Sequence, residues 1–177
     1  MIHINIGSNL DSKFGNRFDN ISMAINMLTE SKLKIIKISN FFETPSYPNK
    51  KDPNFLNVGL LANYESDEKT LIKIINLIEK KIGRIRSNKN DPRVCDIDII
   101  DFKGLVIKDN NLKIPHEKCH LRNFVLYPLQ QIDPEWIHPI IKKNVKFLIS
   151  KLDQKSRIEI TRLNKNVIIK SWLITMN

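Results

Sequence analysis

Cysteine and long apolar stretches are both scarce in this chain of 177 residues. Its two cysteines, Cys95 and Cys119, are too few for a disulfide framework. No apolar run approaches the length of a membrane span, and the first residues, MIHINIG, lack the charged region and long apolar core of a signal peptide. We therefore expect a cytoplasmic protein with reduced thiols.

Internal repeats, low-complexity tracts and interdomain linkers are absent as well, and 177 residues suffice for one domain with its own core. Acidic residues are the minority charge, since 19 Asp and Glu stand against 29 Lys and Arg, which leaves a formal net charge of +10. This excess favours an anionic partner, either a nucleotide or a nucleic acid. Much of it is lysine scattered among isoleucine and asparagine, however, which is also typical of a solvated surface.

Hydrophobic periodicity predicts the order of strands and helices. Strands are expected over 2–6, 33–43 and 55–64 and in the apolar tail of 92–100. Helices are expected near 16–30, from Ser66 as N-cap to Gly83 at the C-terminal end, near 121–132 and near 140–151. The order strand–helix–strand–strand–helix–strand is that of an α+β fold with a ferredoxin-like antiparallel sheet and helices packed on it.

The last 25 residues, 153–177, are expected to form a C-terminal extension. Residues 157–163 alternate between polar and apolar, 164–166 are prone to turn, and 167–173 are apolar and rich in β-branched residues. This pattern predicts a β-hairpin. We expect it to pack on the same domain, because its apolar side chains would otherwise be exposed to water.

The most informative segment is PRVCDIDII, residues 92–100. Side chains two residues apart on a strand point to the same face, so Asp96 and Asp98 project together. Two carboxylates so close repel each other unless a cation lies between them, and Mg²⁺ prefers such oxygen ligands together with substrate phosphates. Arginines of the preceding loop, Arg84 and Arg86, are suited to hold the same phosphates. The combination indicates a transferase that uses a nucleotide.

Seven short motifs follow one another along this chain. They are GSNL (Gly7–Leu10), FETP (Phe42–Pro45), FLN (Phe55–Asn57), GRIR (Gly83–Arg86), PRVCDID (Pro92–Asp98), IPH (Ile114–His116) and RNF (Arg122–Phe124). Together, in this order and spacing, they resemble the 6-hydroxymethyl-7,8-dihydropterin pyrophosphokinase family of folate biosynthesis, from the N-terminus to about residue 150. The resemblance implies transfer of pyrophosphate from ATP to 6-hydroxymethyl-7,8-dihydropterin, giving AMP and the pterin diphosphate, by a domain over 1–152.

The resemblance also implies roles for individual residues. Two Mg²⁺ ions would be bridged by Asp96 and Asp98, which form the catalytic group together with Arg84 and Arg93. The ATP-binding set would be Asn76, Glu79, Arg86, Arg93, His116 and Arg122. The pterin-binding set would be Thr44, Pro45, Phe55, Asn57 and Phe124. The expected partners are these two small molecules, with neither nucleic acid nor membrane, and an association with other folate enzymes is compatible with the family.

The chemistry of these residue types agrees with such roles. The aromatic face of Phe55 suits a flat heterocycle, and Asn57 offers one acceptor and two donors to the polar edge of a pterin. Phosphoryl-type transfer depends mainly on positioning and charge neutralisation, so no residue is assigned as a general base. Two positions depart from the family pattern. Asn88–Asp91 take the place of a Trp-Gly, so an aromatic that would cover the pterin is missing there, and Glu117 stands where an aromatic is frequent.

Two other interpretations of the sequence stay open. A zinc site would use His116, Cys119 and His120 with Cys95 as the fourth ligand, although the spacing fits no standard zinc pattern. An RNA-binding domain of the RRM type shares the element order, although its strands carry clustered aromatics and the third strand here offers only Phe55. Binding of ATP with Mg²⁺, measured against binding of an RNA oligomer, separates these classes.

Overall fold

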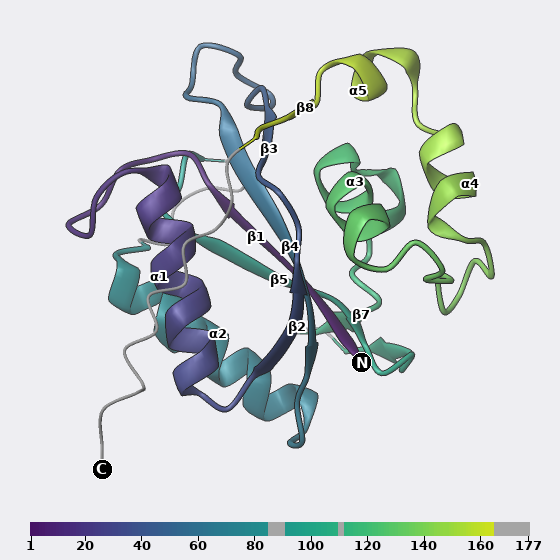
Figure 1. Ribbon diagram of the computed structural model, residues 1–177, viewed down its shortest axis with the longest axis horizontal. Helices are drawn as coiled ribbons and strands as arrows, with labels where there is room; N and C mark the ends of the chain where they lie inside the picture. The colour runs from purple at the N-terminus through teal and green to yellow at the C-terminus, as the bar shows by residue number, and fades with distance from the viewer. Residues whose placement is uncertain (85–90, 110–111, 165–177) are drawn as a thin grey trace.

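The computed structural model describes residues 1–84, 91–109 and 112–164 of the chain. Its centre is an antiparallel sheet with the strand order β5-β1-β4-β3-β8, and β2 also pairs with β4 (Figure 1). The strands of this sheet are β1 (Ile2–Ser8), β2 (Lys34–Ile38), β3 (Phe42–Thr44), β4 (Phe55–Asn63), β5 (Asp96–Phe102) and β8 (Thr161–Arg162). The expected α+β class with an antiparallel sheet is confirmed. A separate hairpin consists of β6 (Ile107–Lys108) and β7 (Lys113–Ile114).

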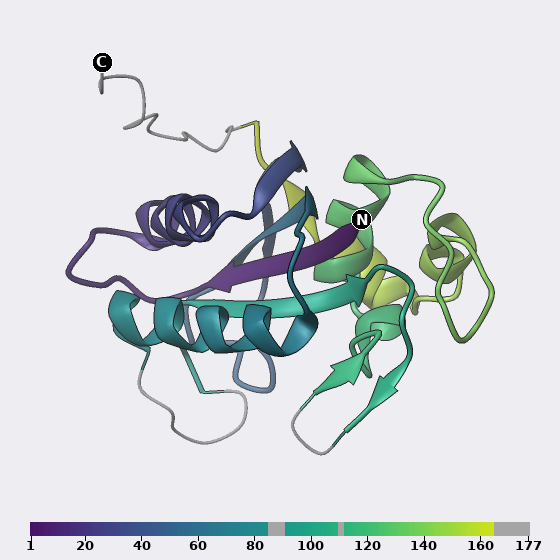
Figure 2. The ribbon, with the colours of Figure 1, turned by 90° about the horizontal axis from the view of Figure 1, so that it is seen from below.

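The helices form two layers, one on each face of the sheet. Figure 2 shows α1 (Arg17–Glu30) and α2 (Glu68–Ile82) on one face and α3 (Asn123–Ile132) on the other. Shorter elements complete the second layer: η1 (Cys119–Leu121), α4 (Val145–Ser150) and α5 (Gln154–Ile158). In the described part of the chain, no helix combines the length and the apolar character needed to cross a bilayer.

Strand β1 is buried along its whole length because both faces are covered. Ile2, Ile4 and Ile6 belong to the core between the sheet and helices α1 and α2. The alternating residues His3 and Asn5 are also buried, on the face toward α3. The polar side chains of this second face therefore lie inside the protein, where they need hydrogen-bond partners.

Helix α3 packs closely on strand β4. A Cβ atom at Gly59 would lie 2.9 Å from the Cβ of Pro128 in this helix, closer than real Cβ contacts. Only glycine therefore allows the backbone of β4 to approach the helix in this way. The contact fixes the helix that begins directly after Arg122.

The helix ends agree with the expected pattern, with one correction. Gly83 ends α2 in the left-handed conformation, φ 111°, as predicted. The N-cap of α2 is Asp67 rather than Ser66, because the Asp67 carboxylate accepts a hydrogen bond from the backbone N–H of Thr70. Two adjacent residues were both able to cap, and the carboxylate has the additional advantage of its charge at the helix N-terminus.

The strand expected over 33–43 is divided into β2 and β3. The register of β2 against β4 shifts between Ile35 and Lys37, and Ser39 then interrupts the strand by accepting a hydrogen bond on its hydroxyl from the N–H of Gly59. The helix expected near 140–151 begins only at Val145, where Asn144 caps it. Local polar side chains thus set both boundaries.

The C-terminal extension begins differently from the expected strand over 157–163. Helix α5 occupies Gln154–Ile158, and Asp153 caps it by accepting from the N–H of Ser156. Strand β8 follows and pairs with β3, so the described part of the extension does pack on the domain. The second strand, expected over 167–173, lies outside the described residues, and the hairpin stays a prediction.

Candidate active site

A cavity of about 590 Å³ opens on the face of the sheet toward α3. Its walls come from β1, the end of β3, β4, β5, the start of α3 and the C-terminal segment. Nine residues that the sequence singled out line it: Thr44, Pro45, Phe55, Asn57, Arg93, Asp96, Asp98, Arg122 and Phe124. Segments far apart in the chain are therefore brought together around one cavity.

One part of the cavity combines aromatic and amide groups. Phe55 and Asn57 both line it from β4, as their shared strand face predicted. Asn5 of β1 donates a hydrogen bond from its Nδ2 to the Oδ1 of Asn57 at 3.3 Å. The Asn57 Nδ2 and the Asn5 Oδ1 are buried and have no hydrogen-bond partner within the described part of the chain. A donor and an acceptor are thus left for a polar ligand edge.

Gly7 is the residue of β1 that faces Asn57 in the sheet register. A Cβ atom there would lie 3.0 Å from the Asn57 Oδ1, so a larger residue would push this amide out of place. Asn5 and Gly7 were not assigned to the site from sequence. The signal was present in the alternation of β1, but it could be used only with the register between β1 and β4.

Another part of the cavity is charged. Asp96 forms ion pairs with Arg84, 2.7 Å from Nη1 to Oδ1, and with Arg93, 3.0 Å from Nη1 to Oδ2. Asp98 has looser partners, since Nη1 of Arg122 lies 3.8 Å and Nε2 of His116 lies 4.0 Å from its Oδ2. The two carboxylates therefore differ in how well their charge is compensated.

The pKa values of Asp98 and His116 reflect their surroundings. Burial and the neighbouring charge of Asp96 raise the pKa of Asp98 to about 7. Burial, followed by the charge of Arg122, lowers the pKa of His116 to about 4, so its imidazole is neutral at pH 7. The pocket thus holds a carboxylate whose nearest cation, Arg122, is only loosely paired at 3.8 Å, which suits a divalent metal ion.

Glu79 supports the charged part from helix α2. Its carboxylate accepts a hydrogen bond from the backbone N–H of Ile97 at 2.8 Å and pairs with Arg84. Burial raises its pKa, against the opposing charge of Arg84. Glu79 therefore joins α2 to β5 and orients Arg84 toward Asp96.

The other predicted ATP-binding residues are spread more widely. His116 lies beside Asp98 and Arg122. Asn76 is exposed on α2, one turn before Glu79, and does not line the cavity. Arg86 lies outside the described residues.

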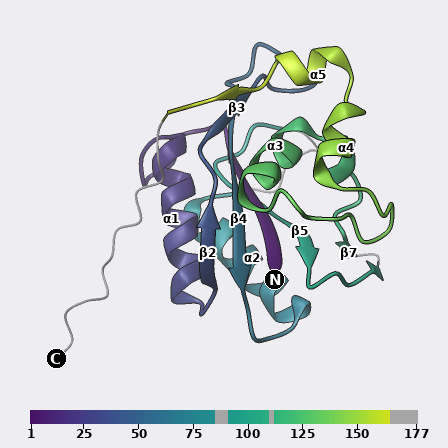
Figure 3. The same cartoon turned by 45° about the vertical axis from the view of Figure 1, so that its right-hand side comes forward.

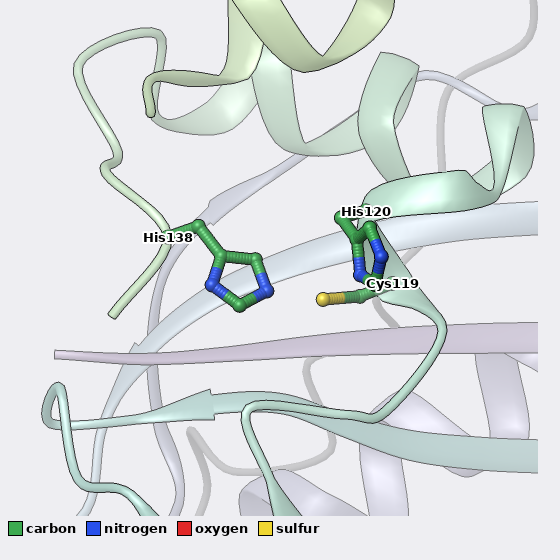
Figure 4. Close-up of side chains that lie close together, drawn as sticks. All are labelled: Cys119, His120 and His138. Carbon is green, nitrogen blue, oxygen red and sulfur yellow. The ribbon is translucent and has the colours of Figure 1, made fainter. Parts of the chain in front are cut away.

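Cysteine and histidine side chains do lie close together, but not in the set considered as the alternative zinc site. Cys95 belongs to the core beside α1 and α2, and Cys119 to the core beside α3, so the sheet separates them. Instead, ligand atoms of Cys119, His120 and His138 lie within 4.8 Å of one another, as Figure 4 shows for their side chains.

The hydrogen bonds of His138 argue against a metal in this cluster. Its Nδ1 accepts from the backbone N–H groups of Ile140 and Ile141, at 3.1 and 3.2 Å. The neutral ring therefore carries its proton on Nε2 and has no lone pair there for a metal. A metal-binding histidine shows the opposite pattern, in which the second nitrogen donates.

A model of the 7,8-dihydro-6-hydroxymethylpterin-pyrophosphokinase (HPPK) family matches residues 3–134 of this chain. The chain belongs to this family. It is therefore a pyrophosphokinase of folate biosynthesis that uses ATP as co-substrate. The 2-amino-4-hydroxy-6-hydroxymethyldihydropteridine pyrophosphokinase of Aquifex aeolicus is 38% identical over 145 residues, which cover 82% of this chain and 88% of that protein.

Longer proteins contain a region similar to this pyrophosphokinase. The folic acid synthesis protein FOL1 of Dictyostelium discoideum is 37% identical over 142 residues, which cover 80% of this chain but 21% of that protein. A crystal structure of Plasmodium falciparum HPPK-DHPS has a TM-score of 0.69 over 91% of this chain and 47% of that one, at 16% identity. The chain thus spans about a fifth to a half of these proteins, and the structural likeness supports the HPPK fold.

Proposed function

We propose that the 590 Å³ cavity is where this pyrophosphokinase transfers pyrophosphate from ATP to 6-hydroxymethyl-7,8-dihydropterin. The observation that carries the assignment is the order of groups across three strands. Asn57 of β4, Gly7 of β1 and Asp96 of β5 stand opposite one another in the sheet register. Two strand spacings, about 10 Å, separate the backbone of Asn57 from that of Asp96, which leaves room for a two-ring heterocycle and its hydroxymethyl arm.

The pterin end would be recognised by stacking and by hydrogen bonds. Phe55 and Phe124 supply aromatic surface for the flat rings. The unpaired Asn57 Nδ2 and Asn5 Oδ1 supply a donor and an acceptor for the polar edge of the pterin. Thr44 and Pro45 complete the wall on this side.

The charged end would hold the triphosphate. Asp96 and Asp98 fit Mg²⁺ because both offer carboxylate oxygens from the same strand face and Asp98 is only loosely paired, with Arg122 at 3.8 Å. We propose that they bind two Mg²⁺ ions, the number that the family resemblance implies. The metal supplies charge neutralisation and orientation to the phosphates when it is bound.

The arginines would act on the phosphates directly. Arg93 and Arg122 line the cavity, and their planar guanidinium groups match phosphate oxygens in pairs. In the transfer, the pterin hydroxyl oxygen bonds to the β-phosphorus of ATP and its proton is released to water. The bond from that phosphorus to the oxygen bridging it to the α-phosphate breaks, and AMP leaves with that oxygen. The chain's contribution is to align these groups and balance their charge.

The packing of the sheet disfavours the RNA-binding interpretation. An RRM reads bases on an open sheet face, whereas here α3 lies directly on β4, with Pro128 against Gly59. We further propose that the protein works in the cytoplasm, which its two free buried cysteines support. An association with another folate enzyme is supported by relatives such as the folate synthesis bifunctional protein of Pisum sativum.

The test is release of AMP from ATP, measured with and without 6-hydroxymethyl-7,8-dihydropterin and with Mg²⁺ or EDTA. We expect AMP only when the pterin, ATP and Mg²⁺ are all present. AMP release without the pterin, or an unchanged rate in EDTA, would contradict the proposed site. Tight binding of an RNA oligomer with no binding of ATP would favour the alternative class.

A further inference from the structure

The C-terminal segment forms part of the cavity although it lies beyond the region that the family model matches. Ser156 and Glu159 line the cavity, whereas the family match ends at residue 134. The segment is firmly attached at both ends. The backbone oxygen of Ser156 accepts a hydrogen bond from Nδ2 of Asn123 at 2.6 Å, and β8 pairs with β3. Glu159 is therefore held at a defined place on the cavity wall.

The loop between β3 and β4 approaches this segment from the other side, as Figure 3 shows near α5. Its base is closed, because the hydroxyl of buried Ser46 donates to the backbone oxygen of Pro53 at 2.6 Å. Its tip is a turn in which Asn49 bonds to Asp52. Lys50 of this turn forms an ion pair with Glu159, 2.6 Å from Nζ to Oε1. This ion pair bridges the tip of the loop to the C-terminal segment.

Tyr47 lies between the base and the tip of the loop. It lines the cavity and yet is 81% exposed. An aromatic ring held this far out in water gains free energy when a flat ligand covers it. Phe55 and Phe124 line the same cavity, so a ring bound there meets aromatic groups from several elements.

We propose that Tyr47 covers the bound pterin and that Glu159 is a positioning residue, which holds the Tyr47 loop over the cavity through Lys50. The inference rests on the proposed function, since it takes the pterin end of the cavity as given. It adds a specificity contact and assigns a role to a segment beyond the family match. The Lys50–Glu159 pair also neutralises an acid that would otherwise repel the incoming phosphates.

The experiment measures the dissociation constants of 6-hydroxymethyl-7,8-dihydropterin and of a non-hydrolysable ATP analogue separately, by calorimetry in Mg²⁺. Tyr47→Ala should weaken pterin binding by about tenfold and leave the analogue unchanged, while Tyr47→Phe should keep both. Glu159→Gln and Lys50→Gln should each weaken pterin binding by about three- to fivefold, as expected for a partly exposed ion pair.

Double variants test whether Lys50 and Glu159 act as a pair. The double variant should be no weaker than either single one, and the exchanged pair Lys50→Glu with Glu159→Lys should recover most of the affinity. Lys51→Gln, at the next exposed lysine of the same turn, is the matched control and should change nothing. Full pterin affinity in Tyr47→Ala, additive losses in the double variant, or no recovery on exchange would overturn the proposal.

These outcomes differ from a failure of the proposed function. If the cavity were not the pterin site, the wild-type protein would bind no pterin in the same calorimeter. Thermal unfolding of every variant checks that it is folded, and Lys50→Gln, at an exposed loop position, remains informative even if a change at Glu159 disturbs α5.

Discussion

We expect the ionised side chain of Asp98 to lower the stability of the metal-free protein. Its side chain keeps 28% of its exposure, but its pKa stands at about 7 because its surroundings remove water from it and Asp96 lies beside it. Asp98→Asn removes the charge and nearly keeps the shape. We expect this substitution to stabilise the metal-free protein and to abolish most of its activity.

The size of the expected stabilisation follows from the pKa of Asp98. Moving it from 3.8 to about 7 corresponds to about 4 kcal/mol against folding once the pH is above 7. The asparagine amide is also desolvated in the cavity, and this cost reduces the gain in stability by about 1–3 kcal/mol. A net gain of about 1–3 kcal/mol in the free energy of unfolding is therefore expected at pH 8.

The stabilisation that Asp98→Asn provides depends on pH. Between about pH 4 and pH 7 the folded protein holds the Asp98 proton that the unfolded chain has released, so the stability of the wild type falls as the pH rises. The advantage of Asp98→Asn should thus be largest at pH 8 and fade toward pH 4. Urea unfolding in EDTA at both pH values measures it.

Asp11→Asn is the matched control, because Asp11 is exposed and does not line the active cavity. We expect Asp11→Asn to leave both the free energy of unfolding and the rate of AMP release close to those of the wild type. Addition of Mg²⁺ with an ATP analogue should stabilise the wild type more than Asp98→Asn. A loss of stability in Asp98→Asn in EDTA at pH 8, or normal Mg²⁺-dependent turnover, would refute the electrostatic reasoning.

Three further substitutions test other parts of the molecule. Phe55→Leu should weaken pterin binding by about 1–3 kcal/mol with little effect on ATP binding, because aromatic surface is lost. Equal losses of pterin and ATP affinity in calorimetry would show instead that Phe55 is a core residue. Arg122→Lys keeps the charge but should lower kcat/KM about tenfold, because the paired contacts of guanidinium are lost; full activity in the AMP assay would contradict this. Burial and His120 lower the pKa of His138, so below about pH 6.5 the unfolded chain binds a proton that the folded one does not, and stability falls. His138→Asn retains an acceptor for the Ile140 N–H, and its Tm should fall less between pH 7 and pH 5 than that of the wild type.

Local patterns in the sequence predict some features well. The period of two on a strand places Asp96 with Asp98 and Phe55 with Asn57, and both pairs line the cavity. Gly83 ends its helix because few other residues adopt its left-handed conformation. Such features depend on neighbours in the chain, so they can be inferred without the fold.

Other features depend on contacts that local patterns do not contain. Asn5 meets Asn57 only through the register of β1 and β4, and Lys50 meets Glu159 across 109 positions of sequence. Residues 157–163 alternate like a strand, but the helix that Asp153 caps extends to Ile158 and so takes the first two of them. Where two local signals compete, their balance is decided by tertiary packing.

The span of the cavity along the chain has a consequence for synthesis. Its walls reach from Asn5 to Glu159, so a growing chain carries no complete binding site until almost all of the described sequence has left the ribosome. Contacts of such high sequence separation form late and slowly. Substrates therefore have no complete site to bind on a partly synthesised chain, and their binding can stabilise only the fully folded protein.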